Sequence, residues 1–175
     1  MSTVYYDYLH TPIGRLMLAA DGRGLRHVDF ENGKYPATIG EDWERGPGAL
    51  HEARTQLKAY FAGKLTAFDL PLAPQGTDFQ QQVWLALLEI PYGTTTSYGE
   101  IARALGDANA TRAVGAANGR NPLPIIVPCH RVIGANGSLT GFGGGLPAKR
   151  WLLEHEAKVL ASRAAAPTRR THALR

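Results

Sequence analysis

The stretch SYGEIARALGDANATRAVGAAN, residues 97–118, decides the fold of the C-terminal half of this 175-residue chain. Ser97 and Glu100 form a capping box, which predicts the start of a helix that ends at Gly106. A second helix is expected from Ala110 to about the end of the stretch. Two short helices joined by a tight, glycine-containing turn are the outline of a helix-turn-helix.

The second of these helices would be the recognition helix, and its side chains are unusually small. We expect Ala113, Val114 and Ala117 to face inward, while Arg112 stands out alone as a long side chain. A helix with small side chains can approach another backbone closely, but the same residues also allow tight packing between helices. Both interpretations stay open, because paired helices are common in proteins that never touch DNA.

Working outward toward the N-terminus, Thr77 and Gln80 form a capping box ahead of a helix that stops before Pro91. A Pro-rich connector at residues 70–76 precedes that helix. Before the connector, short runs split by Gly-containing turns predict a β-meander. Apolar residues at helical spacing over residues 50–61 then predict one helix across the sheet.

The expected fold class is therefore α/β, in two small domains. The N-terminal domain, a β-meander plus helix with its connector, is placed at residues 1–76, and a mostly helical C-terminal domain at residues 77–161. A basic flexible tail is placed at residues 162–175. The chain is 44% hydrophobic and 19% charged, which is typical of a globular protein with a buried core.

Membrane and secretory classes are not expected. No stretch approaches the roughly 20 apolar residues of a membrane span. The first residues also lack the basic-then-apolar pattern of a signal peptide. We expect a cytoplasmic location, associated with the nucleoid in a prokaryote.

The net charge of +4 is unevenly distributed. The tail holds four arginines and no acidic residue, so the rest of the chain is formally neutral. Between Glu100 and Arg150, six basic residues stand against two acidic ones. The six are Arg103, Arg112, Arg120, Arg131, Lys149 and Arg150. This local excess of positive charge is where a phosphate backbone would dock.

Cys129 is the only cysteine of the chain. It cannot form an internal disulfide, supply a cysteine-rich zinc site or use a resolving partner. A lone free cysteine is most often a small buried hydrophobe. As a nucleophile it would need a nearby base or cation, and His130 and Arg131 are the candidates.

The apolar run at residues 125–127 predicts a buried strand, and Pro128 ends it, which places the thiol at a strand end. Neighbouring side chains of a regular strand point to opposite faces. His130 therefore reaches Cys129 only if the chain turns here or if a water bridges them. Downstream, the Gly-rich run at residues 141–145 fits a flexible lid or a close-approach loop, because it lacks the context of a nucleotide-binding motif.

Pro147 starts a final helix that would bring Trp151 and its apolar neighbours toward the core. A carboxylate from this helix could orient His130 as the third member of a Cys-His-acid relay. Judged by their position alone, Glu154 and Glu156 are more typical of solvated helix charges.

Four collinear segments resemble the O6-alkylguanine-DNA alkyltransferases. They are RAVGAAN at 112–118, IVPCHRVI at 126–133, LTGFGGG at 139–145 and WLLEHE at 151–156. The resemblance covers residues 77–156 and includes the Pro-Cys-His-Arg-Val signature, whereas the N-terminal half matches more loosely, through its Thr-Pro-Ile-Gly turn. It implies a ribonuclease H-like N-terminal domain and a winged helix-turn-helix-like C-terminal domain.

The resemblance implies a DNA repair protein that moves an alkyl group, such as methyl, from O6 of guanine and O4 of thymine to Cys129. The transfer would be irreversible, with one turnover per molecule, and would follow flipping of the nucleotide. The implied partner is double-stranded DNA bound from the minor-groove side by a monomer, and cooperative binding stays open. No cofactor is implied. The zinc that some members bind partly through N-terminal cysteines is not expected, because no cysteine precedes Cys129.

The resemblance also assigns roles by position. Cys129 is the acceptor, His130 deprotonates it through a bound water, and Glu156 orients His130. Tyr98 donates a proton toward N3 of the leaving guanine, and Asn121 holds the turn before the cysteine. Arg112 fills the gap left by the flipped nucleotide. The further DNA contacts are Ala113, Gly115, Thr94, Thr95, Ser97 and Arg120, and the pocket residues are Val132, Phe142, Gly143 and Asn118.

Two departures from the family pattern concern the pocket. The family often has tyrosine where this chain has Phe142, and often serine where it has Gly143. A side-chain hydroxyl near O6 is therefore missing, which leaves the preferred alkyl size open.

Two other classes of function remain. A pure DNA-binding module could recognise damaged DNA and recruit other proteins, although the presence of Cys129 argues against it. A Cys-His hydrolase would use the same thiol through an acyl-enzyme, but it needs an oxyanion hole and multiple turnover.

Overall fold

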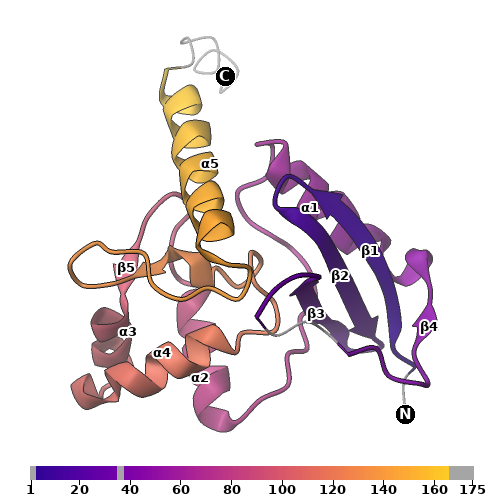
Figure 1. Cartoon of the computed structure of the whole chain (residues 1–175), viewed down its shortest axis with the longest axis horizontal. Helices are drawn as coiled ribbons and strands as arrows, with labels where there is room; N and C mark the ends of the chain where they lie inside the picture. Colours follow the sequence, from indigo (N-terminus) through magenta and orange to yellow (C-terminus); the bar gives the residue numbers. More distant parts are fainter. Residues whose placement is uncertain (1–2, 35–37, 166–175) are drawn as a thin grey trace, which may run out of the picture.

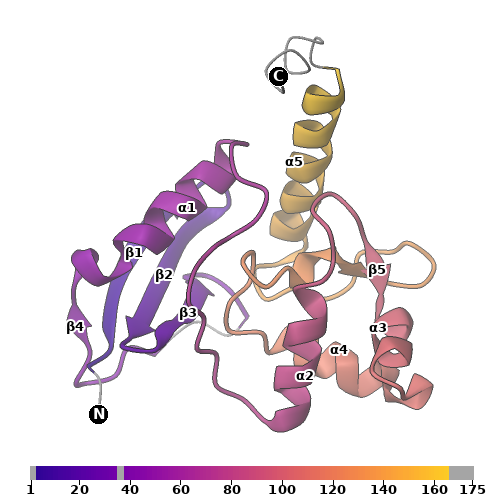
Figure 2. The same ribbon diagram turned by 180° about the vertical axis from the view of Figure 1, so that it is seen from behind.

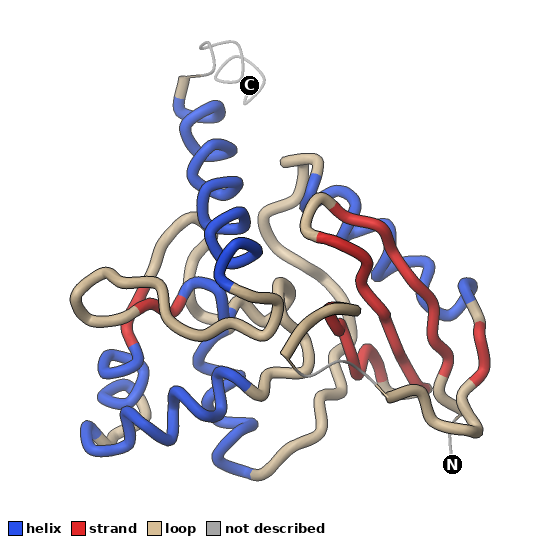
Figure 3. The backbone as a smooth tube through the Cα atoms, in the orientation of Figure 1, coloured by secondary structure: helices blue, strands red, loops and turns tan. Residues whose placement is uncertain are grey.

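The structure is a computed structural model, and it describes residues 3–34 and 38–165. A strand-rich half lies beside a helical half, and the two views in Figures 1 and 2 agree on this arrangement. Figure 3 shows that long loops surround the region where the two halves meet. The α/β fold expected from the sequence is confirmed.

The N-terminal domain is built on the expected antiparallel meander of three strands. These are β1 (Tyr5–Thr11), β2 (Gly14–Asp21) and β3 (Gly24–Phe30). A short strand, β4 (Glu44–Arg45), pairs in parallel with β1, so the sheet order is β3-β2-β1-β4. After the 3₁₀ turn η1 (Pro47–Leu50), helix α1 (His51–Phe61) covers one face of the sheet.

Alternation along β2 gives the sheet two buried faces. Leu16 and Leu18 belong to the main core together with Leu57 of α1. Met17 and Ala19 point the other way, into a smaller apolar cluster. This period of two follows from strand geometry, in which successive side chains point to opposite faces.

Strand β3 joins the two halves through backbone hydrogen bonds. The connector lies along it, since the Leu25 N–H donates to the Pro71 carbonyl over 2.9 Å and the Ala73 N–H donates to the Leu25 carbonyl over 2.8 Å. The Val28 N–H donates to the carbonyl of Pro122 over 2.8 Å. The connector is therefore a paired segment of the fold, and β3 contacts the loop that leads to the cysteine.

The C-terminal half is mostly helical, as expected. Its elements are α2 (Asp78–Leu87), β5 (Thr96–Ser97), α3 (Tyr98–Ala104), η2 (Ala108–Ala110), α4 (Thr111–Gly119), η3 (Cys129–Arg131), β6 (Val132–Ile133) and α5 (Leu146–Ala164). The helix pair α3 and α4 matches the predicted helix-turn-helix, and β5 and β6 form a two-stranded parallel sheet. None of the helices in the described part of the chain has the length and apolar character that a membrane crossing needs.

One of the two predicted capping boxes is complete and the other is half formed. Thr77 and Gln80 exchange both hydrogen bonds at the start of α2. Ser97 accepts from the Glu100 N–H at the start of α3, but the Glu100 carboxylate accepts instead from the Thr96 hydroxyl, over 3.0 Å. The second bond of this capping box, from the Ser97 N–H to the Glu100 carboxylate, is therefore not formed.

The predicted strand at residues 125–127 is wrong. The segment is a buried turn, in which the Val127 N–H donates to the Leu123 carbonyl over 2.8 Å and Ile125 has φ +76°. An apolar run this short does not distinguish a strand from another buried segment. The prolines at 122, 124 and 128 remove the donors that a strand ladder would need.

Two smaller expectations also need correction. Ala113 is exposed on α4, whereas Val114 and Ala117 are buried as predicted. Helix α5 runs to Ala164, so residues 162–164 are helical rather than part of a flexible tail. Ala165 caps this helix, and residues 166–175 of the predicted tail lie outside the described residues.

Candidate active site

Cys129 is the first residue of the 3₁₀ turn η3, and it lies in the core of the molecule. The chain turns here, since Pro128 has ψ 63° and the Arg131 N–H donates to the Pro128 carbonyl over 3.0 Å. Cys129 is 4% exposed and His130 is fully buried. The thiol and the imidazole therefore come from one tight turn rather than from a strand end.

The carboxylate of Glu156, on α5, is hydrogen-bonded to several polar groups in and around η3. Its Oε2 lies 2.7 Å from His130 Nε2 and accepts from Arg131 Nη2 over 3.0 Å. Its Oε1 accepts from Arg131 Nε over 2.9 Å and from the Gly93 N–H over 3.0 Å. The hydroxyl of Tyr60 donates to Oε2 over 2.6 Å. Glu156 is fully buried, so the expectation of a solvated helix charge is wrong for this residue and holds for the exposed Glu154.

The charges of this cluster follow from its contacts. Burial raises the pKa of Glu156, but hydrogen bonds from His130 and Arg131 outweigh burial and hold it well below its usual range. Burial lowers the pKa of His130, so the imidazole is neutral near pH 7. Because His130 Nε2 faces a carboxylate, it holds the proton, and Nδ1 is left as the basic nitrogen. That Nδ1 is buried and has no hydrogen-bond partner among the described residues.

The thiol of Cys129 is protonated at neutral pH. Burial raises the pKa of Cys129 to about 11, although hydrogen bonding from Asn121 and the positive charge of Lys149 oppose the rise. Asn121 also braces the loop before the cysteine, because it donates to the Val127 carbonyl over 2.8 Å and accepts from the Leu123 N–H over 2.9 Å. The thiol therefore needs a base at the moment of reaction.

Lys149 is a functional neighbour that the sequence reasoning placed on the surface. Its ammonium is buried and donates to the carbonyls of Val132 and Thr140, over 2.6 and 2.7 Å. Burial lowers its pKa to about 8. Arg131 is buried as well, so the proposed docking surface loses two of its six cations, and Arg103, Arg112, Arg120 and Arg150 remain exposed.

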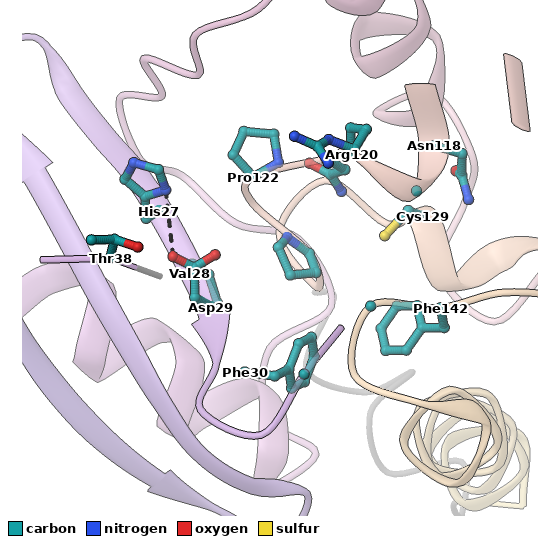
Figure 4. A pocket seen from close by; sticks show the side chains of 15 residues that line it. His27, Val28, Asp29, Phe30, Thr38, Asn118, Arg120, Pro122, Cys129 and Phe142 are labelled. Carbon is teal, nitrogen blue, oxygen red and sulfur yellow. Dashed lines mark ion pairs between the residues drawn. The ribbon is translucent and has the colours of Figure 1, made fainter. Parts of the chain in front are cut away.

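A cavity of about 240 Å³ opens at Cys129, between β3 and the loop after α4. Figure 4 shows the cysteine sulfur on one side of this cavity and His27 and Asp29 of β3 on the other. Of the predicted pocket residues, Asn118, Phe142 and Gly143 line it, whereas the buried Val132 does not. Arg120, predicted as a DNA contact, is the residue that caps the C-terminus of α4, and it also lines this cavity.

A second, larger cavity of about 730 Å³ runs between α4 and the Gly-rich loop. Its lining includes Tyr98, whose hydroxyl is 2.7 Å from the Thr140 hydroxyl, and Gly115 of α4. Gly119, Phe142 and Gly143 border both cavities. The two cavities are therefore neighbours that share these three residues, and Cys129 lines the smaller one while Gly115 of α4 lines the larger one.

The predicted DNA-contact residues outside the cavities are mostly exposed. Arg112 and Ala113 lie on the outer side of α4, and Thr94 and Thr95 lie in the turn before β5. Ser97 is half-buried and serves as the cap of α3.

Family models match both halves of the chain. The model described as 6-O-methylguanine DNA methyltransferase, DNA binding domain, matches residues 78–158. The model described as 6-O-methylguanine DNA methyltransferase, ribonuclease-like domain, matches residues 4–74.

Two methyltransferases match this chain over most of their own length. A methylated-DNA–protein-cysteine methyltransferase of Methanosarcina barkeri is 54% identical over 153 residues, which are 87% of this chain and 97% of the relative. The protein of the same name from Mycobacterium bovis is 55% identical over 153 residues, which are 87% of this chain and 92% of the relative.

Two solved structures have the same fold. The crystal structure of Mycobacterium tuberculosis O6-methylguanine methyltransferase has a TM-score of 0.81 and 52% identity, and the match covers 94% of this chain and 96% of that one. The structure of Mycobacterium tuberculosis OGT in complex with DNA has a TM-score of 0.83 and 54% identity. This match covers 89% of this chain and 94% of that one. The two family models together with these full-length relatives show that the chain belongs to the 6-O-methylguanine DNA methyltransferase family.

Proposed function

We propose that this protein repairs DNA by moving an alkyl group, such as methyl, from O6 of guanine and O4 of thymine to the sulfur of Cys129. The observation that carries the proposal is a buried thiol beside a neutral histidine whose other nitrogen is held by a buried carboxylate. The relatives named methylated-DNA–protein-cysteine methyltransferase and the DNA complex of a relative support it.

The proposed chemistry is one displacement. His130 Nδ1 accepts the thiol proton through a water, and the imidazolium that forms is stabilised by Glu156. The sulfur then attacks the alkyl carbon, so that a carbon–sulfur bond forms as the carbon–oxygen bond breaks. The departing guanine receives a proton at N3 from Tyr98. The thioether that forms on Cys129 is not hydrolysed in water near neutral pH. Each chain therefore turns over once.

The base must leave the duplex to reach the sulfur. We place the DNA on α4, with the minor groove over its small side chains and the flipped base entering between α4 and the Gly-rich loop, where the larger cavity lies. The exposed Arg112 would fill the gap in the duplex, and Asn121 would hold the loop before Cys129. We expect a monomer on DNA to be sufficient for repair.

A pure DNA-binding module and a Cys-His hydrolase explain the active site and the family match less well than alkyl transfer does. A module that only recognises damage has no use for a buried thiol with a histidine and carboxylate beside it. Neither family model that matches the chain describes a hydrolase.

The function is tested by intact mass spectrometry after the protein is mixed with duplex DNA that contains O6-methylguanine. We expect a gain of one methyl group per chain, which peptide mapping places on Cys129 and which does not rise further with excess DNA. Retained binding to this DNA with no gain in mass would instead indicate a damage-recognition module. Sustained turnover of a thioester would support the hydrolase.

The Arg112→Ala variant separates flipping from chemistry. We expect it to slow methyl transfer from duplex DNA about tenfold, because the unstacked duplex loses the side chain that stabilises it. Transfer from free O6-benzylguanine should stay at the wild-type rate, since that base needs no flipping. The Arg23→Ala variant, which removes an exposed arginine of the β2–β3 turn, is the matched control. Equal losses on both substrates in Arg112→Ala would exclude Arg112 as the inserted residue.

A further inference from the structure

Tyr60 belongs to the N-terminal domain, yet its hydroxyl reaches the residues around Cys129. It lies near the end of α1, and its side chain is 0% exposed. Its Oη donates to Glu156 Oε2 over 2.6 Å, across 96 positions of sequence. Its backbone carbonyl accepts from His155 Nε2 over 2.8 Å, so both ends of the residue are bonded to α5.

Aromatic packing fixes the direction of the Tyr60 hydroxyl. The Tyr60 ring lies 5.6 Å from Phe68, 5.4 Å from His155 and 6.2 Å from Tyr92, measured between ring centres. Rings at these separations restrict one another. The hydroxyl is therefore held against Glu156.

Tyr60 is one of several groups that donate hydrogen bonds to the Glu156 carboxylate. Oε2 of Glu156 is shared by Tyr60, His130 and Arg131, and Oε1 by Arg131 and Gly93. Among the described donors to this carboxylate, Tyr60 alone comes from the N-terminal domain. It also competes with His130 for the same oxygen. Each hydrogen bond to a carboxylate lowers its basicity, so donors that share one oxygen are each attracted less strongly.

We propose that Tyr60 is a positioning residue for the reaction of Cys129: it fixes the Glu156 carboxylate and so sets the orientation and basicity of His130. The N-terminal domain then completes the active site instead of only supporting it. Burial and the charge of Glu156 raise the pKa of Tyr60 well above its usual range, so the hydroxyl stays a donor at neutral pH. Its relevance to repair rests on the proposed function, but its effect on Cys129 does not.

The Tyr60→Phe variant keeps the ring and removes the hydroxyl. We expect the rate of methyl transfer from O6-methylguanine DNA to fall about tenfold, because a hydrogen bond to a charged group is lost, while affinity for that DNA is unchanged. Without the competing donor, Glu156 stabilises protonated His130 more strongly, and the pKa of His130 rises. The acidic limb of the pH–rate profile therefore moves to higher pH.

Tyr92→Phe is the matched control. The Tyr92 hydroxyl is buried, has no hydrogen-bond partner among the described residues, and sits on the ring next to Tyr60. Its removal should leave both the rate and the pH profile at wild-type values. Both variants are compared at a temperature well below the lower of their Tm values, so that a loss of folded protein does not contribute.

Two further measurements test the role of Tyr60, one with a substitution that keeps its hydroxyl and one without DNA. Site-specific 3-fluorotyrosine at position 60 keeps the hydroxyl and makes it a stronger donor, so the acidic limb should move to lower pH. Alkylation of Cys129 by iodoacetamide, followed by intact mass, reports the same limb without DNA.

The outcomes are distinct. A shifted iodoacetamide profile in Tyr60→Phe with no methyl transfer by the wild type would sustain the role of Tyr60 and reject the proposed function. Wild-type rates and profiles in Tyr60→Phe would overturn the role of Tyr60. An equal effect of Tyr60→Phe in a Glu156→Gln background would overturn it too, because the effect must pass through Glu156.

Discussion

We expect the Cys129→Ser variant to transfer no measurable methyl group from O6-methylguanine DNA, a loss on the order of 10⁴-fold or more. Serine fits the space of the buried cysteine, so the turn η3 and the fold should be kept. The serine hydroxyl is much less acidic than a thiol whose pKa is already raised to about 11. His130, whose pKa is lowered by burial, is too weak a base to ionise it.

The same variant should bind DNA as the wild type does. The exposed cations and α4 lie outside η3, and the substitution changes no charge. Intact mass measures the transfer and fluorescence anisotropy measures the binding, with Cys129→Ala as a second variant that lacks any nucleophile. Methyl gain by Cys129→Ala would show that another residue is the acceptor. Loss of binding together with transfer would point to a disrupted fold.

The sequence predicted the parts of the fold that depend on local periodicity and on turn chemistry. The meander follows from short runs broken by glycines, and Gly14 and Gly24 indeed have φ +107° and +152° at the two turns. The helix pair α3 and α4 follows from the cap at Ser97 and from small-residue spacing. At residues 125–127 the same reasoning failed, because burial there comes from packing between distant elements and not from a strand ladder.

The charged residues of the active site could not be placed by local pattern. Arg131 and Lys149 have the sequence context of surface cations, yet both are buried by partners that only the tertiary fold supplies. Glu156 lies on a helix whose other charged residues, apart from Lys149, are exposed. The residue pattern allowed a carboxylate of this helix to orient His130, but only the family resemblance selected Glu156. Tyr60 was missed because its partner is 96 positions away. Its position on the apolar face of α1 was the available signal, and that signal indicates only burial.

The Glu156→Ala variant should lower the free energy of unfolding by about 3 to 5 kcal/mol, since removal of one partner leaves a buried charge uncompensated. That charge is the guanidinium of Arg131, which keeps one bond to the Ile90 carbonyl, over 2.7 Å. The exposed Glu154→Ala on the same helix is the matched control and should change stability by less than about 0.5 kcal/mol. Urea denaturation of both variants measures the difference.

The pH dependence of unfolding isolates the part that belongs to the Glu156 charge. Its pKa is held well below its usual range in the folded protein by His130 and Arg131, so the stabilisation is complete above the unfolded-state pKa and is lost as the pH falls toward the folded one. Wild type and Glu154→Ala should therefore lose stability on acidification more steeply than Glu156→Ala, and the three curves should approach one another at low pH. A constant gap at all pH values would mean that Glu156→Ala acts by leaving a cavity. In that case, packing of α5 rather than ion pairing would be what Glu156 contributes to stability.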